Sequence, residues 1–417
     1  METEILHKKK LLAPKLRFNE FDGKWKSIII GDYVISSAFG PRFSSDLYDD
    51  SGNVLTLRTT DMDNDGNICY DKVPLAKLNL DELKEHILLK DDLVISRSGT
   101  IGVTGIFQGC SIPVIPGAFL IRFRFKKDGL APEFVRLYFN SSKGRNEIES
   151  LSAGGVQKNL TGTSVLKMSL VVPRFTEQQK IASFLSAVDE KIQKLTRKKE
   201  LLEQYKKGVM QQLFSGKLRF KDENGKAFPK WEEKELNDLC EIARSGGTPQ
   251  STKKEFYNGD IPFLSISDMT SQGKYLKYTS NHISKLGLEN SASWIVPANS
   301  IIYSMYASVG FVAINNVPIA TSQAVLNLIL KENINTEFIY YTLIDFQKKV
   351  SRFITTGTQG NLNAQTVKGF KIKLPCFEEQ KRLADFLSNI DVRIENQNTQ
   401  ITQTQTFKKG MLQQMFV

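Results

Sequence analysis

Cysteine and histidine are scarce in this chain of 417 residues, which holds four cysteines and three histidines. The cysteines are Cys69, Cys110, Cys240 and Cys376, and no two of them form a CxxC pair. The histidines are equally scattered, so no zinc-ligand spacing occurs and we predict no metal site. Cysteines this far apart indicate reduced thiols, as in a cytoplasmic protein.

Long hydrophobic runs are also missing. The most apolar stretch, 301–314, is short and carries Ser304, Tyr306 and Ser308, so it is not a membrane span. The first 18 residues include three lysines but no apolar segment after them, which argues against a signal peptide. We therefore expect a cytoplasmic protein that does not bind a membrane.

Recognisable catalytic motifs are absent as well. The sequence contains no GxxxxGK[ST], HExxH or GxSxG pattern, and no Asn-Pro-Pro-aromatic or Asp-Pro-Pro-aromatic tetrapeptide of an amino-methyltransferase. Asp61, Asp63 and Asp65 alternate before Gly66, but no glutamate follows where a calcium loop needs one, so we predict a solvated turn. We predict no catalytic residue and no cofactor site in this chain, because a binding protein explains the sequence more simply than an enzyme does.

Positive charge, in contrast, is abundant. The chain has 56 lysines and arginines against 45 aspartates and glutamates, a formal net charge of +11. Such an excess favours a polyanionic partner, and nucleic acid fits better than a membrane. The length suggests two or three domains.

An internal repeat organises the whole chain. Residues 172–214 align without a gap to residues 374–416, and 16 of these 43 pairs are identical. Both copies share a Pro-x-Phe-x-Glu-Gln signature at the start and a Lys-Lys-Gly-x-x-Gln-Gln-x-Phe signature at the end. Fainter matches continue upstream, where Asp61-Met62 aligns with Asp268-Met269, and Ser96 and Gly102 align with Ser304 and Gly310. The chain is thus one module written twice, and its globular parts have diverged most.

Each module reads as a mixed α+β domain followed by a long helix. Alternating residues predict strands at 166–172, 370–374 and 120–126. Single helices are expected over 132–148 and 337–353, the second capped by Thr336. In the strand at 120–126, the basic face formed by Arg122, Arg124 and Lys126 is either a solvent face or a phosphate contact.

The terminal segments carry a heptad seam of apolar residues. In the first copy it runs from Ile181 to Leu213 and is interrupted by Lys199 and Lys206. Two such helices bury each other most simply as an antiparallel pair; the alternative is that each packs on its own domain. The Gln/Thr-rich middle of the second helix, around Gln397, is a poor helix former, and we expect it to be loose.

These signatures together resemble the specificity subunit of type I restriction–modification systems, over essentially the whole chain. The resemblance implies an α+β fold in which two homologous target recognition domains are joined by two long antiparallel helices, a coiled-coil-like spacer. It implies a leader at 1–15, recognition domains at 16–176 and 220–376, and helical spacers at 177–219 and 377–417.

The same resemblance implies a function and a set of partners. Each recognition domain is expected to read one half of a bipartite site in double-stranded DNA, while the helices set the gap and dock two modification subunits. S-adenosylmethionine would bind to the modification subunits, which methylate adenine. Restriction subunits would bring ATP and magnesium. Such a complex works in the cytoplasm of a bacterium or archaeon, and this chain would be non-catalytic on its own.

Candidate DNA contacts are loop residues with basic, amide or hydroxyl groups, since these residue types read base edges and grip phosphates. In module one they are Arg42, Arg58, Arg97, Ser98, Gln157, Lys158 and Asn159. In module two they are Ser245, Gly247, Thr248, Gln250, Lys253, Ser267, Tyr306, Gln359 and Asn361.

Two other functions remain open from the sequence. In a protein–protein adaptor, the helices would recruit partners and the domains would bind something other than DNA. A self-sufficient methyltransferase is the second alternative, and the missing catalytic tetrapeptide argues against it.

Overall fold

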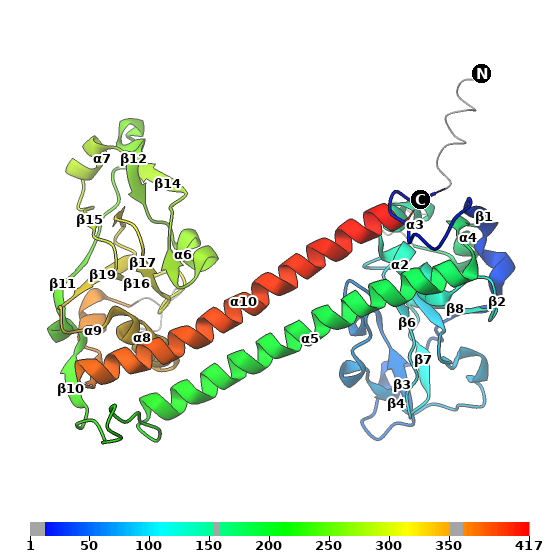
Figure 1. Ribbon diagram of the computed structural model, residues 1–417, viewed down its shortest axis with the longest axis horizontal. Helices are drawn as coiled ribbons and strands as arrows, with labels where there is room; N and C mark the ends of the chain where they lie inside the picture. Colours follow the sequence, from blue (N-terminus) through cyan, green and yellow to red (C-terminus); the bar gives the residue numbers. More distant parts are fainter. Residues whose placement is uncertain (1–12, 153–158, 351–361, 417) are drawn as a thin grey trace. The chain divides into compact units, whose positions relative to one another are not determined.

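The computed structural model describes residues 13–152, 159–350 and 362–416. The chain forms two compact units, unit 1 from Met1–Thr196 with Thr399–Val417, and unit 2 from Arg197–Asn398. Each unit contains one globular module, part of the long helix that follows it, and part of the other module's long helix (Figure 1). The units therefore divide the chain differently from the sequence repeats.

Unit 1 is built on three small sheets. Their strands are β1 (Lys26–Ile29), β2 (Val34–Phe39), β3 (Val54–Leu57), β4 (Leu75–Ala76), β5 (Leu93–Ser96), β6 (Thr104–Ile106), β7 (Val114–Pro116), β8 (Leu120–Phe125) and β9 (Ser169–Val172). The largest sheet is antiparallel in the order β2-β8-β5-β6. The second has the order β4-β3-β7, with β3 and β7 parallel, and the third pairs β1 with β9.

In the described part of unit 1, three short α-helices accompany the sheets: α2 (Pro132–Asn140), α3 (Ser142–Leu151) and α4 (Gly162–Leu166). The prediction of a single helix over 132–148 is wrong, because the helix is interrupted at Ser141 and a second helix begins there. The Ser141 hydroxyl caps α3 by accepting a hydrogen bond from the Gly144 amide at 3.1 Å. Residue 166, predicted as strand, ends α4 instead.

Unit 2 repeats this plan. Its strands are β10 (Glu232–Glu235), β11 (Cys240–Ser245), β12 (Tyr257–Phe263), β13 (Tyr275–Leu276), β14 (Asn281–Ile283), β15 (Ile295–Val296), β16 (Ile301–Ser304), β17 (Val312–Asn315), β18 (Ile319–Ala320), β19 (Val325–Leu330) and β20 (Lys371–Leu374). The order β11-β19-β16-β17 matches β2-β8-β5-β6, and the parallel pair β12-β18 matches β3-β7. The duplicated α+β fold predicted from the repeat is confirmed.

The helices of unit 2 are α6 (Ile266–Gln272), α7 (Lys285–Glu289), α8 (Thr336–Val350) and α9 (Ala364–Lys368). The cap predicted at Thr336 is wrong by one residue, since the Asn335 side chain accepts the Phe338 amide at 2.8 Å. The end predicted for this helix, residue 353, lies outside the described residues.

Two long helices complete the units, α5 (Phe175–Phe214, 40 residues) and α10 (Phe377–Met415, 39 residues). In unit 1 the first part of α5 meets the last part of α10, where the rings of Phe184 and Phe407 lie 6.3 Å apart. In unit 2 the last part of α5 meets the first part of α10, where Lys206 pairs with Asp391. The antiparallel pairing is thus confirmed in each unit, and the alternative of separately packed helices is wrong.

The Gln/Thr-rich stretch of α10 is helical throughout, so the expected loosening is wrong. Pairing with α5 compensates for its weak helix propensity: Gln397 is buried, and the Lys199 ammonium donates to Asn398 Oδ1 at 3.1 Å. Within the described part of the chain, no helix has the length and apolar character of a membrane span.

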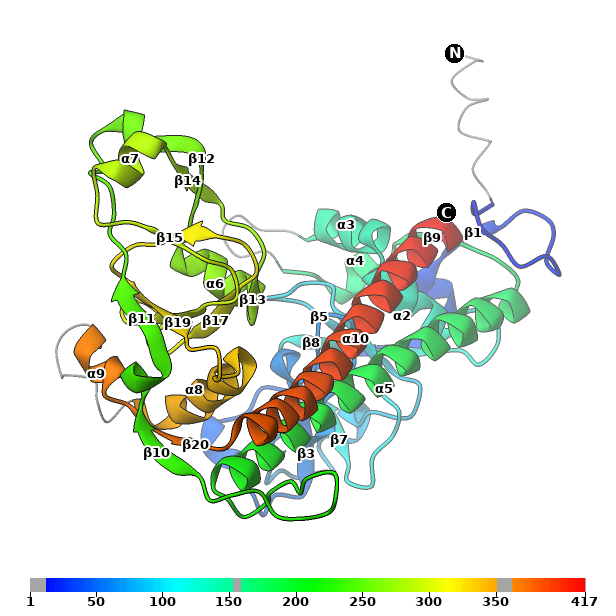
Figure 2. The same ribbon diagram turned by 60° about the vertical axis from the view of Figure 1, so that its left-hand side comes forward.

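Each unit has a core that draws on both long helices. In unit 1, Leu185 of α5 and Met415 at the end of α10 pack with α2, which lies beside that end of α10 in Figure 2. In unit 2, Leu213 of α5 and Leu387 of α10 join the core beneath α8. The last residues of the second repeat therefore complete the core of unit 1.

Candidate nucleic-acid interface

Module one gathers several loops at one edge of its two larger sheets. The Gly117 amide, after β7, donates to the Leu57 carbonyl at the end of β3 across 2.7 Å. The Arg97 amide, after β5, donates to the Phe119 carbonyl at 2.9 Å, and the Leu160 amide donates to the Arg97 carbonyl at 3.0 Å. We name this surface the module-one edge; it consists of residues 40–44, 58–60, 97–99, 117–119 and 159–160.

The described candidates of module one all lie on this edge: Arg42, Arg58, Arg97, Ser98 and Asn159. Arg42 and Arg58 are exposed and line one cavity of about 550 Å³. The guanidinium of Arg97 lies 4.6 Å from the centroid of the Phe39 ring, a cation–π contact that leaves it half-buried. The fold thus brings together residues that are up to about 120 positions apart in the sequence.

Module two forms the equivalent edge after β18. The Gly247 amide donates to the Thr321 carbonyl at 3.0 Å, and the Leu264 amide donates to the Ala320 carbonyl at 2.9 Å. The Met305 amide donates to the Ala324 carbonyl at 2.9 Å. We name this surface the module-two edge; it consists of residues 245–253, 264–267, 305–308 and 321–324.

The described candidates of module two lie on the second edge: Ser245, Gly247, Thr248, Gln250, Lys253, Ser267 and Tyr306. All are exposed except Ser245, which is half-buried, and Gly247, which is buried. A Cβ at Gly247 would stand 2.7 Å from the Ala292 side chain, so this glycine allows two loops to approach closely. Since its amide already bonds Thr321, its contribution is to the shape of the edge.

Four further candidates, Gln157, Lys158, Gln359 and Asn361, lie outside the described residues. The described residues that follow them make equivalent contacts in the two modules. The Leu160 amide donates to the carbonyl of Arg97, which follows β5, and the Leu362 amide donates to the carbonyl of Met305, which follows β16, at 2.9 Å.

Two aromatic residues, one on the module-one edge and one in contact with the module-two edge, were not predicted. Phe119 of module one is 59% exposed on the rim of the cavity. Trp294 of module two lies beneath the Arg244 guanidinium at 4.2 Å and donates from its ring nitrogen to the Ser245 carbonyl at 3.3 Å. An isolated aromatic residue beside small residues is as typical of a core as of a binding surface, so the sequence held no distinguishing signal.

The three alternating aspartates have different environments. Asp61 is 1% exposed and binds the Arg58 guanidinium through both carboxylate oxygens, a pairing that raises the pKa of Arg58. The Asp63 carboxylate accepts the Asn67 side-chain amide at 2.8 Å within an exposed turn that also includes Asp65. The predicted solvated turn is therefore wrong for Asp61. Among the described residues, no cluster of acidic, histidine and cysteine side chains could hold a metal ion.

The basic face predicted at 120–126 meets solvent at Lys126, which is exposed and donates to the Asp32 carbonyl at 2.6 Å, but not at its two arginines. Arg122 is 2% exposed and donates to the Ser36 hydroxyl at 3.0 Å. Arg124 forms a two-pronged pair with the buried Asp92 at 2.8 and 2.7 Å. Both guanidiniums also donate to carbonyls in residues 85–87, so they hold that loop onto the sheet. A phosphate contact through Arg124 is not supported.

The Glu-Gln pair of the repeated signature anchors each long helix to its module. Glu177 is 1% exposed; Arg17 binds it at 2.7 Å, and the Trp25 ring nitrogen donates to it at 3.3 Å. In module two the same contacts join Glu379, Arg219 and Trp231. The sequence marked these residues as repeated but did not reveal this role.

The neighbouring glutamine makes a second anchor. Gln178 accepts the Ala131 amide at 2.9 Å, just before α2, and donates to the Pro173 carbonyl at 3.0 Å. Gln380 does the same with the Asn335 amide and the Pro375 carbonyl, both at 2.9 Å. The start of each long helix is therefore fixed to the start of the helix that covers its module.

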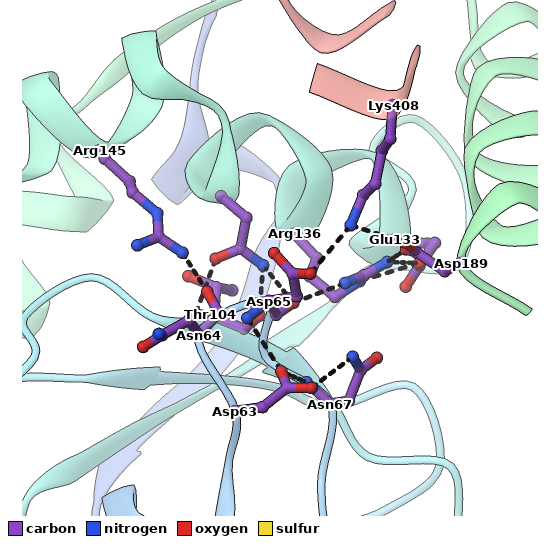
Figure 3. Close-up of polar contacts among 11 residues, drawn as sticks. Asp63, Asn64, Asp65, Asn67, Thr104, Glu133, Arg136, Arg145, Asp189 and Lys408 are labelled. Carbon is purple, nitrogen blue, oxygen red and sulfur yellow. Dashed lines mark hydrogen bonds and ion pairs between the residues drawn. The ribbon is translucent and has the colours of Figure 1, made fainter. Parts of the chain in front are cut away.

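Polar residues that interrupt the heptad seam meet partners on the opposite helix. In unit 1 the Lys408 ammonium lies between Asp189 at 2.6 Å and Asp65 at 3.5 Å, while Arg136 binds Asp189 at 3.2 Å (Figure 3). The repeat counterparts of Lys408 and Asp189 are Lys206 and Asp391. These two residues form the equivalent ion pair in unit 2, at 2.5 Å. Burial and a hydrogen bond to Asp391 raise the pKa of Tyr341 in the same cluster.

Comparisons with a family model and with known proteins all point to the same family. The model of the type I restriction modification DNA specificity domain matches residues 23–204 and 229–404. The chain is 25% identical over 449 residues to the type I restriction enzyme HindI specificity subunit of Haemophilus influenzae, a match covering 89% of this chain and 95% of that protein. It is 30% identical over 194 residues to the MjaIX specificity subunit of Methanocaldococcus jannaschii, which covers 45% of this chain and 44% of that protein.

A solved structure shares the fold. The S subunit of a type I restriction–modification system from M. genitalium superposes with a TM-score of 0.63 over 97% of this chain and 99% of its own, at 15% sequence identity. The duplicated modules, the repeated helix anchors and these matches lead to one conclusion: the chain belongs to the family of type I restriction–modification DNA specificity subunits, with two target recognition domains.

Proposed function

We propose that each recognition domain reads one half of a bipartite site in double-stranded DNA. The observation that carries this proposal is the combination of a repeated frame with differing side chains at the same edge. The exposed candidates of the module-one edge include Arg42 and Arg58, whereas the module-two edge exposes the hydroxyl of Thr248 and the amide of Gln250 beside a single basic candidate, Lys253. Two domains with one fold and different edges can read two different half-sites, since base edges are distinguished by donors and acceptors.

The contacts with DNA would come from the candidate residues at the two edges. Arg42 and Lys253 are exposed and suit phosphate oxygens or guanine, and the exposed amide of Gln250 suits adenine. The four candidates outside the described residues belong to the same proposal. They precede Leu160 and Leu362, whose amides donate hydrogen bonds to the carbonyls of Arg97 and Met305 on the two edges. Arg122 and Arg124 are excluded from it, because they are committed within the domain.

The long helices would set the gap between the half-sites and dock two modification subunits. A helix of 40 residues at about 1.5 Å per residue is about 60 Å long. The spacing of half-sites on one face of a duplex is about 34–36 Å, so helices of this length suffice as a spacer. The modification subunits would bind S-adenosylmethionine and methylate adenine, and restriction subunits would add ATP- and magnesium-dependent cleavage. The chain itself would supply no catalytic group.

Mapping methylated adenines in a genome that expresses this chain with its modification subunit tests the proposal. We expect one split, asymmetric motif with a fixed gap; the absence of any split motif would overturn it. A gel-shift assay with the modification subunit present separates the proposal from a protein–protein adaptor, which would not retard DNA. Incubating the purified chain with S-adenosylmethionine and DNA separates it from a self-sufficient methyltransferase, which would transfer methyl groups unaided.

The role of the helices as a ruler is tested by lengthening them. Four residues inserted after Lys198, with four more after Gln400 at the equivalent place in α10, preserve the pairing and add about 6 Å. We expect the gap in the methylated motif to grow by one or two base pairs, because DNA rises about 3.4 Å per base pair. An active variant with an unchanged gap would contradict the ruler. A substitution of Arg197 by lysine at the same place, without added length, serves as the control.

A further inference from the structure

A buried aspartate at each edge holds the residue three positions before it. In module one the Asp61 carboxylate accepts the Arg58 amide at 2.8 Å, and in module two the Asp268 carboxylate accepts the Ser265 amide at 3.0 Å. The aspartates are 1% and 4% exposed, so both belong to the frame of the domain. Each aspartate is the third residue of a short helical turn that follows strand β3 or β12, namely the 3-10 turn Thr59–Asp61 or helix α6.

The residue whose side chain binds this aspartate differs between the modules. Arg58 donates to Asp61 from Nε at 3.1 Å and from Nη2 at 2.8 Å. Ser265 donates from its hydroxyl to Asp268 at 2.7 Å. The frame residue is therefore the same, and the residue that it orients is long and cationic in one module but short and neutral in the other. A position of this kind can change what a domain reads without changing its fold.

The surroundings of Arg58 form a site. Its side chain is 46% exposed and borders the cavity of about 550 Å³, together with the exposed Arg42 and the partly exposed rings of Tyr48 and Phe119. Thr56 also lines this cavity; the residue is 1% exposed, and its hydroxyl has no hydrogen-bond partner among the described residues. The cavity thus combines a fixed guanidinium, a free hydroxyl and aromatic surface.

The N–H groups of Arg58 that remain without a partner indicate which base the site can bind. Of the five N–H groups of Arg58, one on Nε and one on Nη2 bind Asp61, and Nη2 also donates to the Lys72 carbonyl at 3.1 Å. The two donors on Nη1 have no partner within the described part of the chain. In the major groove, guanine is the base that offers two neighbouring acceptors, O6 and N7, and arginine is its commonest reader.

We infer that Arg58, held in place by Asp61, reads a guanine in the half-site of module one, and that position 58 and its counterpart 265 are specificity-determining positions of the two domains. This inference rests on the proposed reading of DNA by the edges. Because the carboxylate orients the guanidinium before DNA binds, less side-chain freedom is lost on binding, which sharpens discrimination. Arg42, which is exposed and lines the same cavity, is suited to the neighbouring phosphate.

The experiment compares the methylated motifs of Arg58→Ser, Arg58→Lys and the unaltered chain, each expressed with the modification subunit. Arg58→Ser places the module-two residue in the same turn, where a serine already bonds the aspartate, so the domain should fold. Arg58→Lys keeps the charge but loses the planar fork. For both variants we expect the guanine preference to weaken at one position of one half-site by roughly 5- to 100-fold, the range expected for the loss of one specific base contact. The other half-site and the gap should not change.

Arg197→Lys is the matched control, since this exposed arginine of α5 pairs with Glu200 and lies on neither edge; its motif should equal that of the unaltered chain. If the unaltered chain gives a split motif without guanine in either half-site, or if both Arg58 variants keep the full guanine preference, the inference is overturned. A uniform loss of methylation with unchanged base preference overturns it too, because it assigns Arg58 to phosphate or to stability. If the unaltered chain gives no split motif, the proposed function itself fails, which is a different result.

Discussion

Replacing Phe416 by alanine tests whether the end of the second repeat completes the core of unit 1. Phe416 is 8% exposed, and its ring centroid lies 5.2 Å from that of Phe134 and 5.6 Å from that of Tyr138, both in α2. Removing a buried phenylalanine ring costs about 3–5 kcal/mol. Because Phe416 keeps 8% exposure and lies just past the last residue of α10, we expect a loss at the lower end of this range, about 3 kcal/mol.

Amide hydrogen exchange measures this loss unit by unit. A change of about 3 kcal/mol corresponds to roughly a 100-fold fall in protection for the most protected amides. We expect this fall in peptides from α2 and β9, whereas peptides from α8 in unit 2 should exchange at their original rate. For a unit of this size the melting temperature should drop by about 6–12 °C.

The control is Phe407→Ala in α10, nine positions before Phe416. Phe407 is 46% exposed, so the same change in chemistry should cost less than about 1 kcal/mol and leave α2 protected. If Phe416→Ala leaves the exchange of α2 unchanged, or weakens both units equally, the assignment of the end of the second repeat to the core of unit 1 is refuted.

Two further predictions follow from buried groups. Arg124→Ala should destabilise unit 1 by about 2 kcal/mol, because it leaves the 2%-exposed Asp92 carboxylate without its cation, while the salt dependence of DNA binding stays the same; a binding slope reduced by about one unit would show that Arg124 contacts phosphate. At pH 7 the exposed Cys69 and Cys110 should react with a maleimide in the native protein, whereas Cys240 should react only after unfolding, since burial raises the pKa of its thiol to about 11. Reaction of native Cys240 at the rate of Cys110 would contradict its burial.

The sequence determined the architecture at the level of the repeat. Sixteen identities in 43 ungapped pairs indicate a common structure for the two terminal segments, and the heptad spacing predicted that structure to be a long helix with one apolar face. The family followed from the same residues. A heptad pattern is a local property of consecutive residues, so it can be read without knowing what lies nearby in space.

Local propensity was misleading where tertiary contacts outweighed it. The Gln/Thr stretch of α10 is helical because α5 covers it, and the helix expected over 132–148 breaks because the Ser141 hydroxyl can cap a new one. The alternation in β8 correctly placed Arg122 and Arg124 on one face, but it could not tell that residues 85–87 and Asp92 cover that face. Alternation reports two faces of a strand, and only the packing of a distant loop decides whether a face meets solvent.

The edges themselves were decided entirely by tertiary structure. Gly117 and Leu57 are 60 positions apart, yet their hydrogen bond places the residues after two parallel strands side by side. The sequence could nominate Arg58 as a polar loop residue, but only the fold shows it bound to a buried aspartate beside a cavity. The repeated Glu and Gln were visible in the sequence as a signature, and their role as helix anchors emerged only with their partners from other parts of the chain. The residues that recur were therefore readable from the sequence, whereas what each of them touches depends on contacts between segments that the sequence keeps far apart.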